Sequence, residues 1–194
     1  MYHIIERNKD ELSDIYELYD KNKLIMYDNT HEYKTICYET YDNICKKYIN
    51  KFINNDNKIL CENIFNLSLS ILQEFNLESN NVGTIEIHET SSNDIINHIH
   101  NSFGVHKDND NHICNTIIYY LYFEDTLKGG ELVICDNDIP NISLNKIITK
   151  ISPLSSNDEN IKIVVLEGSV YHYVEDLSGI GKRVSVVVQC LKNN

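Results

Sequence analysis

The hydrophobic positions in the first 80 residues follow the helical period. Apolar and aromatic side chains recur three and four positions apart in three stretches, which run from Leu12 to Tyr19, from Tyr41 to Phe52 and from Leu60 to Phe75. Side chains with this spacing share one face of an α-helix, and that face is buried against another part of the protein. The pattern therefore predicts three amphipathic helices that pack on the remainder of the chain.

After residue 80 the pattern changes to short apolar runs separated by turn residues. Glycine-containing turns, such as Lys128-Gly129-Gly130 and Ser178-Gly179-Ile180-Gly181, divide some of these runs, as is expected between β-strands. The predicted strands cover residues 84–89, 94–100, 114–123, 131–135, 161–166, 170–174 and 184–190. Many short strands with turns between them are typical of a double-sheet β-barrel or jelly roll.

The chain of 194 residues has the length of one domain. We predict a mainly β protein with N-terminal helices, an α+β arrangement in which residues 1–80 form a helical segment that packs on a β core of residues 81–194. Residues 136–160 are polar and poorly periodic. That segment is either a lid beside a pocket or a disordered surface loop.

Charge and composition narrow the range of partners. The formal net charge is −12 and the lysines are scattered, whereas nucleic-acid binders cluster Lys and Arg against phosphates. Nucleic acid is therefore not an expected partner, while the acidic balance fits a soluble protein and suits an encounter with a basic polypeptide. The first ten residues carry charges and no apolar run reaches membrane-spanning length, so we expect a cytoplasmic protein without a membrane partner. The six cysteines form no Cys-x-x-Cys pair, which favours reduced, mostly buried thiols.

Candidate chemistry lies in the stretch from Ser102 to Asp108, where one residue separates His106 from Asp108. If this stretch is a β-strand, both side chains point to one face. They would then supply two ligands of a 2-His-1-carboxylate facial triad, which holds non-haem Fe(II) with positions left open. His172 is the candidate for the second histidine. The alternative is a turn in which Asp108 caps a backbone group.

The last predicted strand carries a second signal. By the two-residue period, one face bears Arg183, Ser185, Val187 and Gln189, and the other bears Val184, Val186, Val188 and Cys190. A buried arginine without an acidic partner is costly, and this strand contains no acidic residue. The partner of Arg183 is therefore either a distant Asp or Glu or the carboxylate of a small molecule, and a guanidinium beside a hydroxyl suits the small molecule.

These residues resemble a known enzyme family, the Fe(II)/2-oxoglutarate-dependent dioxygenases, and most closely its prolyl 4-hydroxylase-like branch. The resemblance covers roughly Thr84 to Cys190. The matching pieces, in order, are His106-Lys107-Asp108, the strand Ile117–Phe123, Gly129-Gly130-Glu131-Leu132, His172 and Gly181-Lys182-Arg183-Val184-Ser185.

The resemblance implies a double-stranded β-helix, or jelly roll, flanked by helices. It implies that His106, Asp108 and His172 bind Fe(II) and form the catalytic centre. It further implies that 2-oxoglutarate binds with its distal carboxylate on Arg183, and that Ser185 and Tyr120 donate hydrogen bonds to it. The implied reaction is hydroxylation of a C–H bond, foremost of a prolyl residue in a protein or peptide, with release of succinate and CO2. Ascorbate is the implied accessory cofactor.

The chain departs from the family at one position. Many members carry a tyrosine on the strand before the His-x-Asp pair, whereas this chain reads Ile96-Asn97-His98-Ile99-His100 there. His98 or His100 is a candidate substitute for that tyrosine. Each can equally be read as a surface histidine or as a core histidine with its hydrogen bonds satisfied.

Several other functions stay open from the sequence. A 2-oxoglutarate-dependent nucleic-acid demethylase would keep the cofactors, but such enzymes carry a further arginine where this chain has Val187-Val188-Gln189-Cys190. A small-molecule hydroxylase is also compatible with the ligand set. An inactive jelly-roll binding module would leave His106 and His172 structural, and a zinc hydrolase would give Arg183 no role.

Overall fold

The computed structural model describes residues 1–23, 30–42, 44, 47–77, 79, 83–99, 104–108, 113–136 and 146–191. Two α-helices and two antiparallel sheets account for most of this part of the chain. The helical elements are η1 (Lys9–Leu12), α1 (Ser13–Lys21), η2 (Asn55–Asn57) and α2 (Lys58–Glu74). The strands are β1 (Tyr2–Asn8), β2 (Thr30–Asp42), β3 (Lys47–Phe52), β4 (Gly83–Ile99), β5 (Ile113–Phe123), β6 (Leu127–Gly129), β7 (Leu132–Cys135), β8 (Ile147–Ile151), β9 (Asn160–Glu167), β10 (Tyr171–Val174) and β11 (Leu177–Leu191).

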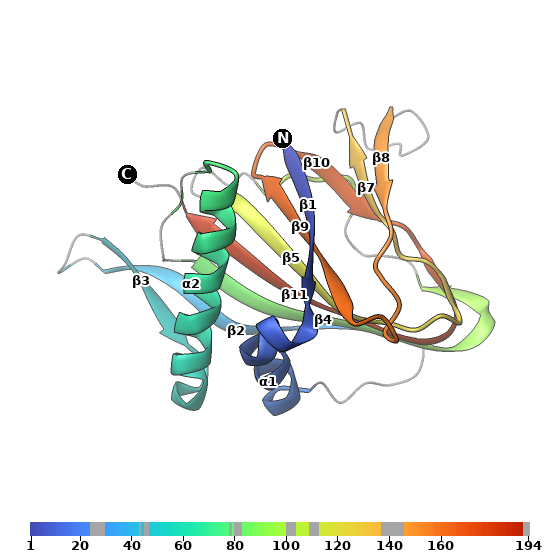
Figure 1. Ribbon diagram of the computed structural model, residues 1–194, viewed down its shortest axis with the longest axis horizontal. Helices are drawn as coiled ribbons and strands as arrows, with labels where there is room; N and C mark the ends of the chain where they lie inside the picture. Colours follow the sequence, from blue (N-terminus) through green and yellow to red (C-terminus); the bar gives the residue numbers. More distant parts are fainter. Residues whose placement is uncertain are drawn as a thin grey trace.

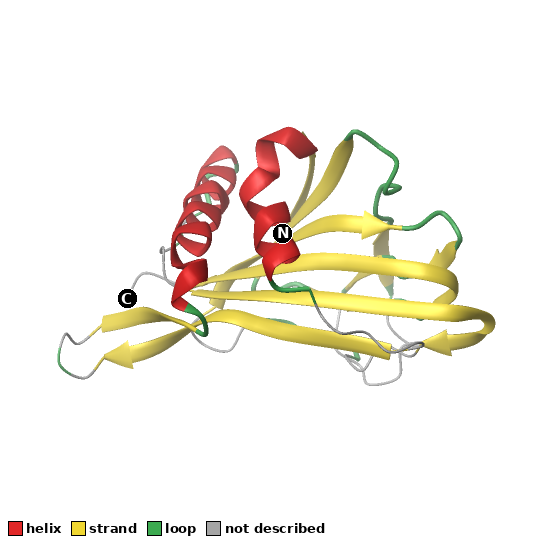
Figure 2. Cartoon of the chain, turned by 90° about the horizontal axis from the view of Figure 1, so that it is seen from below, coloured by secondary structure: helices red, strands yellow, loops and turns green. Residues whose placement is uncertain are grey.

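A large sheet forms the centre of the molecule. Its strands follow the order β1-β9-β5-β11-β4-β2-β3, and β6 pairs with one end of β11. A small sheet has the order β10-β7-β8. Figure 1 shows the small sheet at the end of the molecule opposite the β2–β3 hairpin, and Figure 2 shows both helices on one face of the large sheet. No helix in the described ranges is both long enough and apolar enough to cross a membrane.

Two of the buried hydrophobic clusters lie on opposite faces of the large sheet, and a smaller third one belongs to the small sheet. Alternation along β5 divides its side chains between the first two, since neighbouring residues of a strand point to opposite faces. Tyr119 and Leu121 belong to the cluster that the helices cover, whereas Ile118 and Tyr120 belong to the cluster under the small sheet. The face of the large sheet that the helices leave open is therefore available for a pocket beneath the small sheet.

The central strand β11 shows the same division and confirms the period predicted for it. Val184, Val186, Val188 and Cys190 are fully buried in the cluster beneath the helices. Arg183, Ser185, Val187 and Gln189 point to the other face and line a cavity there. A run of four apolar side chains thus anchors the strand on one side and fixes its polar positions on the other.

Most of the predicted elements are confirmed. The first and third predicted helices correspond to α1 and α2, and the predicted strands correspond to β4, β5, β7, β9, β10 and β11. Residues 84–89 and 94–99 belong to one long strand rather than two, and residue 100 lies outside the described residues. Part of segment 136–160 forms β8, while residues 137–145 lie outside the described ranges. Five strands, β1, β2, β3, β6 and β8, were not predicted.

The predicted helix over residues 41–52 is wrong, because this segment belongs to the β2–β3 hairpin. Tyr41 faces Tyr48 and Thr40 faces Ile49 across the two strands. At the turn, the backbone N–H of Ile44 donates a hydrogen bond of 2.7 Å to the side chain of Asp42, which is a local bond that favours a turn over a helix. Tyrosine and isoleucine also suit a strand better than a helix. The first 80 residues therefore contribute strands as well as helices, and the domain boundary at residue 80 stays a prediction.

Candidate active site

Two distant segments bring the predicted metal ligands together. His106 and Asp108 lie in the segment 104–108, and His172 lies on β10. The backbone N–H of His106 donates to the carbonyl of His172 over 3.0 Å, and the N–H of His172 donates to the carbonyl of His106 over 2.8 Å. This single bridge takes the place of the strand that was one reading of the His-x-Asp pair, since segment 104–108 belongs to no described strand. It holds the two imidazole rings with their centres 4.4 Å apart.

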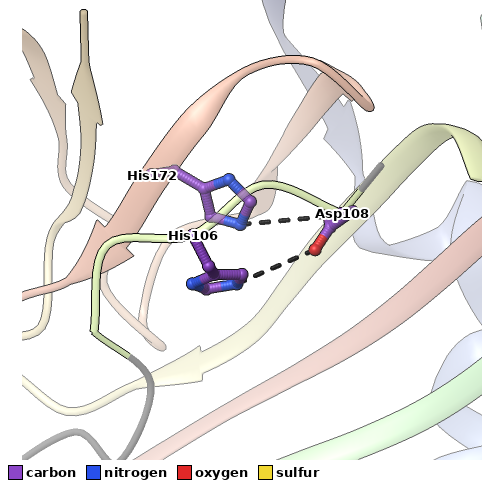
Figure 3. A group of neighbouring side chains, drawn as sticks. All are labelled: His106, Asp108 and His172. Atoms are coloured by element: carbon purple, nitrogen blue, oxygen red, sulfur yellow. Dashed lines mark ion pairs between the residues drawn. The ribbon is translucent and has the colours of Figure 1, made fainter. Parts of the chain in front are cut away.

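The three side chains form a compact set of donors. One ligand atom from each of His106, Asp108 and His172 lies within 4.8 Å of the others. The Nε2 atom of His106 is 3.7 Å from Oδ1 of Asp108, and the Nε2 atom of His172 is 3.9 Å from Oδ2. Figure 3 shows both rings directed toward the carboxylate. Two imidazoles and one carboxylate gathered in this way can hold a divalent metal ion.

Backbone carbonyls set the protonation of both histidines. The Nδ1 atom of His106 is 2.7 Å from the carbonyl oxygen of Gly104, and the Nδ1 atom of His172 is 3.0 Å from that of Val170. Because a carbonyl only accepts, each Nδ1 carries the hydrogen, and in the neutral ring Nε2 is the nitrogen that can bind a metal. Burial also lowers the pKa of His172, although the charge of Asp108 acts in the opposite direction. The rings are therefore prepared as ligands before a metal binds.

Thr116 orients the carboxylate of the set. Its hydroxyl, on β5, donates a hydrogen bond of 2.6 Å to Oδ2 of Asp108, and the side chain is buried. Sequence reasoning missed this residue. A signal was present, because Thr116 shares the alternating face of its strand with Ile118 and Tyr120, which point toward the pocket side. The bond leaves the remaining lone pairs of Asp108 directed away from β5 and toward the histidines.

A cavity of about 160 Å³ adjoins the three ligands. Its walls come mainly from the large sheet, with contributions from the small one. The lining residues are Glu86, His88, His106, Asp108, Ile118, Leu132, His172, Val174, Arg183, Ser185, Val187 and Gln189. The structure thus brings five of the six predicted site residues into one pocket, and it adds Glu86, His88 and Gln189, which the sequence analysis did not single out for a role there. The sixth, Tyr120, lies beside Arg183, whose guanidinium carbon is 5.4 Å from the centre of the phenol ring.

Arg183 is a buried cation without an acidic partner. Its exposed fraction is 5%, and no carboxylate in the described part of the chain lies within ion-pair distance of it. Its Nε atom and the hydroxyl of Tyr120 are both buried and make no hydrogen bond with the described residues. Burial raises the pKa of Tyr120 while the charge of Arg183 opposes that rise, so the phenol is a donor at neutral pH. Ser185, on the same face of β11, is also buried.

The donors of Arg183, Tyr120 and Ser185 fit a carboxylate ligand. A guanidinium, a phenol and a serine hydroxyl can all donate to the oxygens of one acid group. An anion of this kind would also balance the buried charge, which is costly when unpaired. The ligand set and this donor group lie in one pocket, so the residues present suit a metal ion and a small organic acid together.

Comparison with known proteins supports the fold. No protein-family model and no curated protein matches the chain. Among solved structures, the chain is similar to IDO from Bacillus thuringiensis (TM-score 0.60, 16% identity, covering 98% of this chain and 91% of that one). It is also similar to an oxidoreductase of the 2OG-Fe(II) oxygenase family from Burkholderia pseudomallei (TM-score 0.58, 15% identity, covering 100% and 86%). A third is the viral collagen prolyl hydroxylase from Paramecium Bursaria Chlorella virus-1, in its 2OG complex (TM-score 0.52, 12% identity, covering 99% and 96%).

These similarities extend over nearly the whole chain and show its fold. The molecule has the jelly-roll fold of the 2OG-Fe(II) oxygenases, with two antiparallel sheets and helices on one face. The predicted fold class, mainly β with flanking N-terminal helices, is therefore confirmed. Within this fold, the described residues place a His-Asp-His set at one pocket.

Proposed function

We propose that this protein is an Fe(II)- and 2-oxoglutarate-dependent dioxygenase that hydroxylates a C–H bond and releases succinate and CO2. One observation supports the proposal above all others: the facial set of His106, Asp108 and His172 opens into the same cavity as Arg183, which is buried and has no acidic partner among the described residues. A metal-only reaction, such as zinc-dependent hydrolysis, would explain the first feature and leave the second without a role. A keto acid beside a ferrous ion accounts for both.

The residues take separate roles in this proposal. His106 and His172 would hold Fe(II) through their Nε2 atoms and Asp108 through its carboxylate. Arg183 would bind the distal carboxylate of 2-oxoglutarate, with hydrogen bonds from Ser185 and Tyr120. When bound, the iron supplies the redox chemistry that couples decarboxylation of the keto acid to oxidation of a C–H bond.

The side chains and carbonyls of the protein orient the metal ligands and keep water out of the cavity. The carbonyls of Gly104 and Val170 place the hydrogen of each neutral ring on Nδ1, so that Nε2 is the ligating atom, and Thr116 fixes the carboxylate. Apolar side chains form the rest of the cavity wall and limit the access of water. They are Ile118, Leu132, Val174 and Val187. A dry pocket strengthens the charge interaction of Arg183 with its ligand and protects the reaction from side reactions.

For the substrate, we propose a prolyl residue in a protein or peptide. A collagen prolyl hydroxylase of viral origin shares the fold over almost the whole chain, and the acidic character of this chain, with a net charge of −12, argues against a nucleic acid. We propose ascorbate as an accessory reductant and the cytoplasm as the location. These assignments follow from the resemblance of the motifs and from the composition.

Anaerobic addition of Fe(II) and 2-oxoglutarate tests the core of the proposal. We expect a visible charge-transfer band that requires both additions and that His172→Ala abolishes, while circular dichroism shows the variant still folded. The band reports binding of the metal and the keto acid without turnover. If the folded wild-type protein gives no band under these conditions, the proposed function is wrong and a binding module is favoured.

Substrate class is then tested by succinate release in air. We expect release to be stimulated by proline-containing peptides and not by methylated oligonucleotides. Stimulation by the oligonucleotides alone would reject the peptide substrate and keep the cofactors. Stimulation only by free small molecules would reassign the enzyme as a small-molecule hydroxylase.

A further inference from the structure

A second pair of ionisable side chains, Glu86 and His88, lines the same cavity. Both lie on β4, whose other face sends Ile85 and Ile87 into the core beneath the helices. In the pairing with β11, Glu86 lies opposite Val187 and His88 lies opposite Ser185. The pair therefore stands beside the row of β11 side chains that begins with Arg183.

Contacts from β2 hold this pair in place. The Nε2 atom of His88 is 3.1 Å from Oε2 of Glu86, and the hydroxyl of Thr35 donates to Oε1 of Glu86 over 3.4 Å. The ring of Tyr33 stacks on His88 with ring centres 5.8 Å apart. The side chains of His88 and Glu86 are 16% and 25% exposed. Glu86 is thus a fixed, largely buried carboxylate rather than a mobile surface charge.

The charge balance of the pocket leaves Glu86 without a permanent counter-charge. The carboxylates among the described lining residues belong to Asp108 and Glu86, and the permanent cation among them is Arg183. Under the proposed function, the charges of a ferrous ion, Asp108, Arg183 and the dianion of 2-oxoglutarate sum to zero. The carboxylate of Glu86 then remains as a negative charge in a poorly hydrated pocket, where an unpaired charge is unfavourable.

Its position assigns Glu86 to the substrate rather than to the keto acid. Val187, the partner of Glu86, follows Arg183 by four residues, which is roughly 13 Å along an extended strand. A second carboxylate near Arg183 would repel the distal carboxylate of the keto acid, and the length of the strand keeps Glu86 away from that group. Val187 is two residues from Gln189, which pairs with Thr116, the residue that bonds to Asp108. Glu86 therefore stands toward the metal ligands, where the molecule that is oxidised has to bind.

We propose that the substrate carries a cationic side-chain group, an ammonium or a guanidinium, near the C–H bond that is oxidised, and that Glu86 binds this group while His88 orients Glu86. The inference rests on the proposed function and narrows its substrate class. A cation is the partner that the chemistry of Glu86 selects, because its oxygens retain free lone pairs after the bonds to Thr35 and His88. A basic side chain in a peptide and a free basic amino acid would both supply it.

Binding measurements under anaerobic Fe(II) and 2-oxoglutarate test the proposal without turnover. One arm compares a fluorescein-labelled Gly-Pro-Lys-Gly peptide with the same peptide containing norleucine in place of lysine, by fluorescence anisotropy. The other arm compares free L-lysine with free L-norleucine by calorimetry. We expect the cationic member of at least one pair to bind about tenfold more tightly. The arm that shows this preference identifies the source of the cation.

Variants connect the preference to Glu86. Glu86→Gln should remove the preference and leave the anaerobic charge-transfer band intact, and Glu86→Lys should reverse it toward a Gly-Pro-Glu-Gly peptide. Glu32→Gln, on the exposed surface of β2, is the control and should change neither quantity. Equal binding of both members in both arms, or a preference that survives Glu86→Gln, would overturn the inference. Loss of the band in the wild type would instead overturn the proposed function, so the two failures are distinguishable.

Discussion

At the scale of single residues, backbone carbonyls orient the two histidine rings of the candidate metal site. The carbonyls of Gly104 and Val170 each lie two residues before a histidine and accept from its Nδ1 atom. The same local arrangement therefore occurs twice, on two unrelated segments of the chain. In both places it fixes the tautomer and the direction of the ring with no second side chain.

Thr116 gives a prediction at this scale. Thr116→Val keeps the shape of the side chain and removes the hydrogen bond to Asp108, which is 2.6 Å long. Loss of such a supporting bond weakens metal affinity roughly 10- to 100-fold, and we expect this loss in a competition titration of Fe(II) against a chelator. Thr149→Val, on β8 and outside the pocket lining, is the matched control. Unchanged affinity in Thr116→Val would mean that Asp108 is held by other contacts.

The predictability of the site also differs from residue to residue. His106 and Asp108 were found from their spacing, and Arg183 and Ser185 from an alternating strand that contained a cation with no acidic neighbour; the structure brings them together with His172. Glu86 was missed because nothing in its own strand marks it. Its position depends on the register between β4 and β11, and a pairing between strands almost 100 positions apart cannot be read from local patterns.

At the scale of elements, long strands with clean alternation were predicted correctly and ambiguous periods were not. β5 and β11 each alternate between two buried clusters, so their faces could be assigned from the sequence. The segment over residues 41–52 has apolar positions that fit a helix and also fit a hairpin, in which Tyr41 and Tyr48 face each other. Pairing with the partner strand decides between a helix and a hairpin, and local sequence patterns do not show which segments pair. β1 escaped for a similar reason, since it is an edge strand whose pairing with β9 spans most of the chain.

Gly129, at the end of β6 where that strand pairs with β11, gives a prediction at this scale. Gly129 has a φ of +80°, and a Cβ atom there would clash with the carbonyl oxygen of Asp176. Both the left-handed backbone and the close approach exclude a side chain. We expect Gly129→Ala to lower the free energy of unfolding by at least about 2 kcal/mol in urea denaturation. Gly104→Ala, where a Cβ atom meets nothing within 4 Å, should change it little; equal effects at both positions would contradict this view of the turn.

At the scale of the whole molecule, the pocket favours ligand binding and lowers the stability of the unliganded protein. Arg183 is buried without an acidic partner in the described ranges, and such a charge costs free energy until a ligand neutralises it. The cost falls on the unliganded protein alone. Replacing Arg183 by an apolar residue should therefore not lower the stability of the unliganded protein, whereas it should lower the stability measured with the keto acid bound.

Arg183→Met tests this expectation. We expect the unliganded variant to be as stable as the wild type or more stable by about 1 kcal/mol. With Fe(II) present in every sample, 2-oxoglutarate at about 100 times its Kd should stabilise the wild type by about 2.7 kcal/mol, which raises Tm by roughly 5–10 °C, and should not stabilise the variant further. Arg7→Met, which removes a surface ion pair with Glu74, should keep the ligand response. A variant that is destabilised without ligand would show that Arg183 has a partner in the protein.

The order of strands in the large sheet has a consequence for biosynthesis. β11 lies between β5 and β4 although it follows both in the sequence, and it carries Arg183, while His172 precedes it by only a few residues. Almost all of these 194 residues must therefore be synthesised before the three candidate metal ligands and Arg183 can come together in one pocket. Under the proposed function, nascent chains and fragments that stop before β10 would lack His172 and would therefore not form the complete three-ligand site.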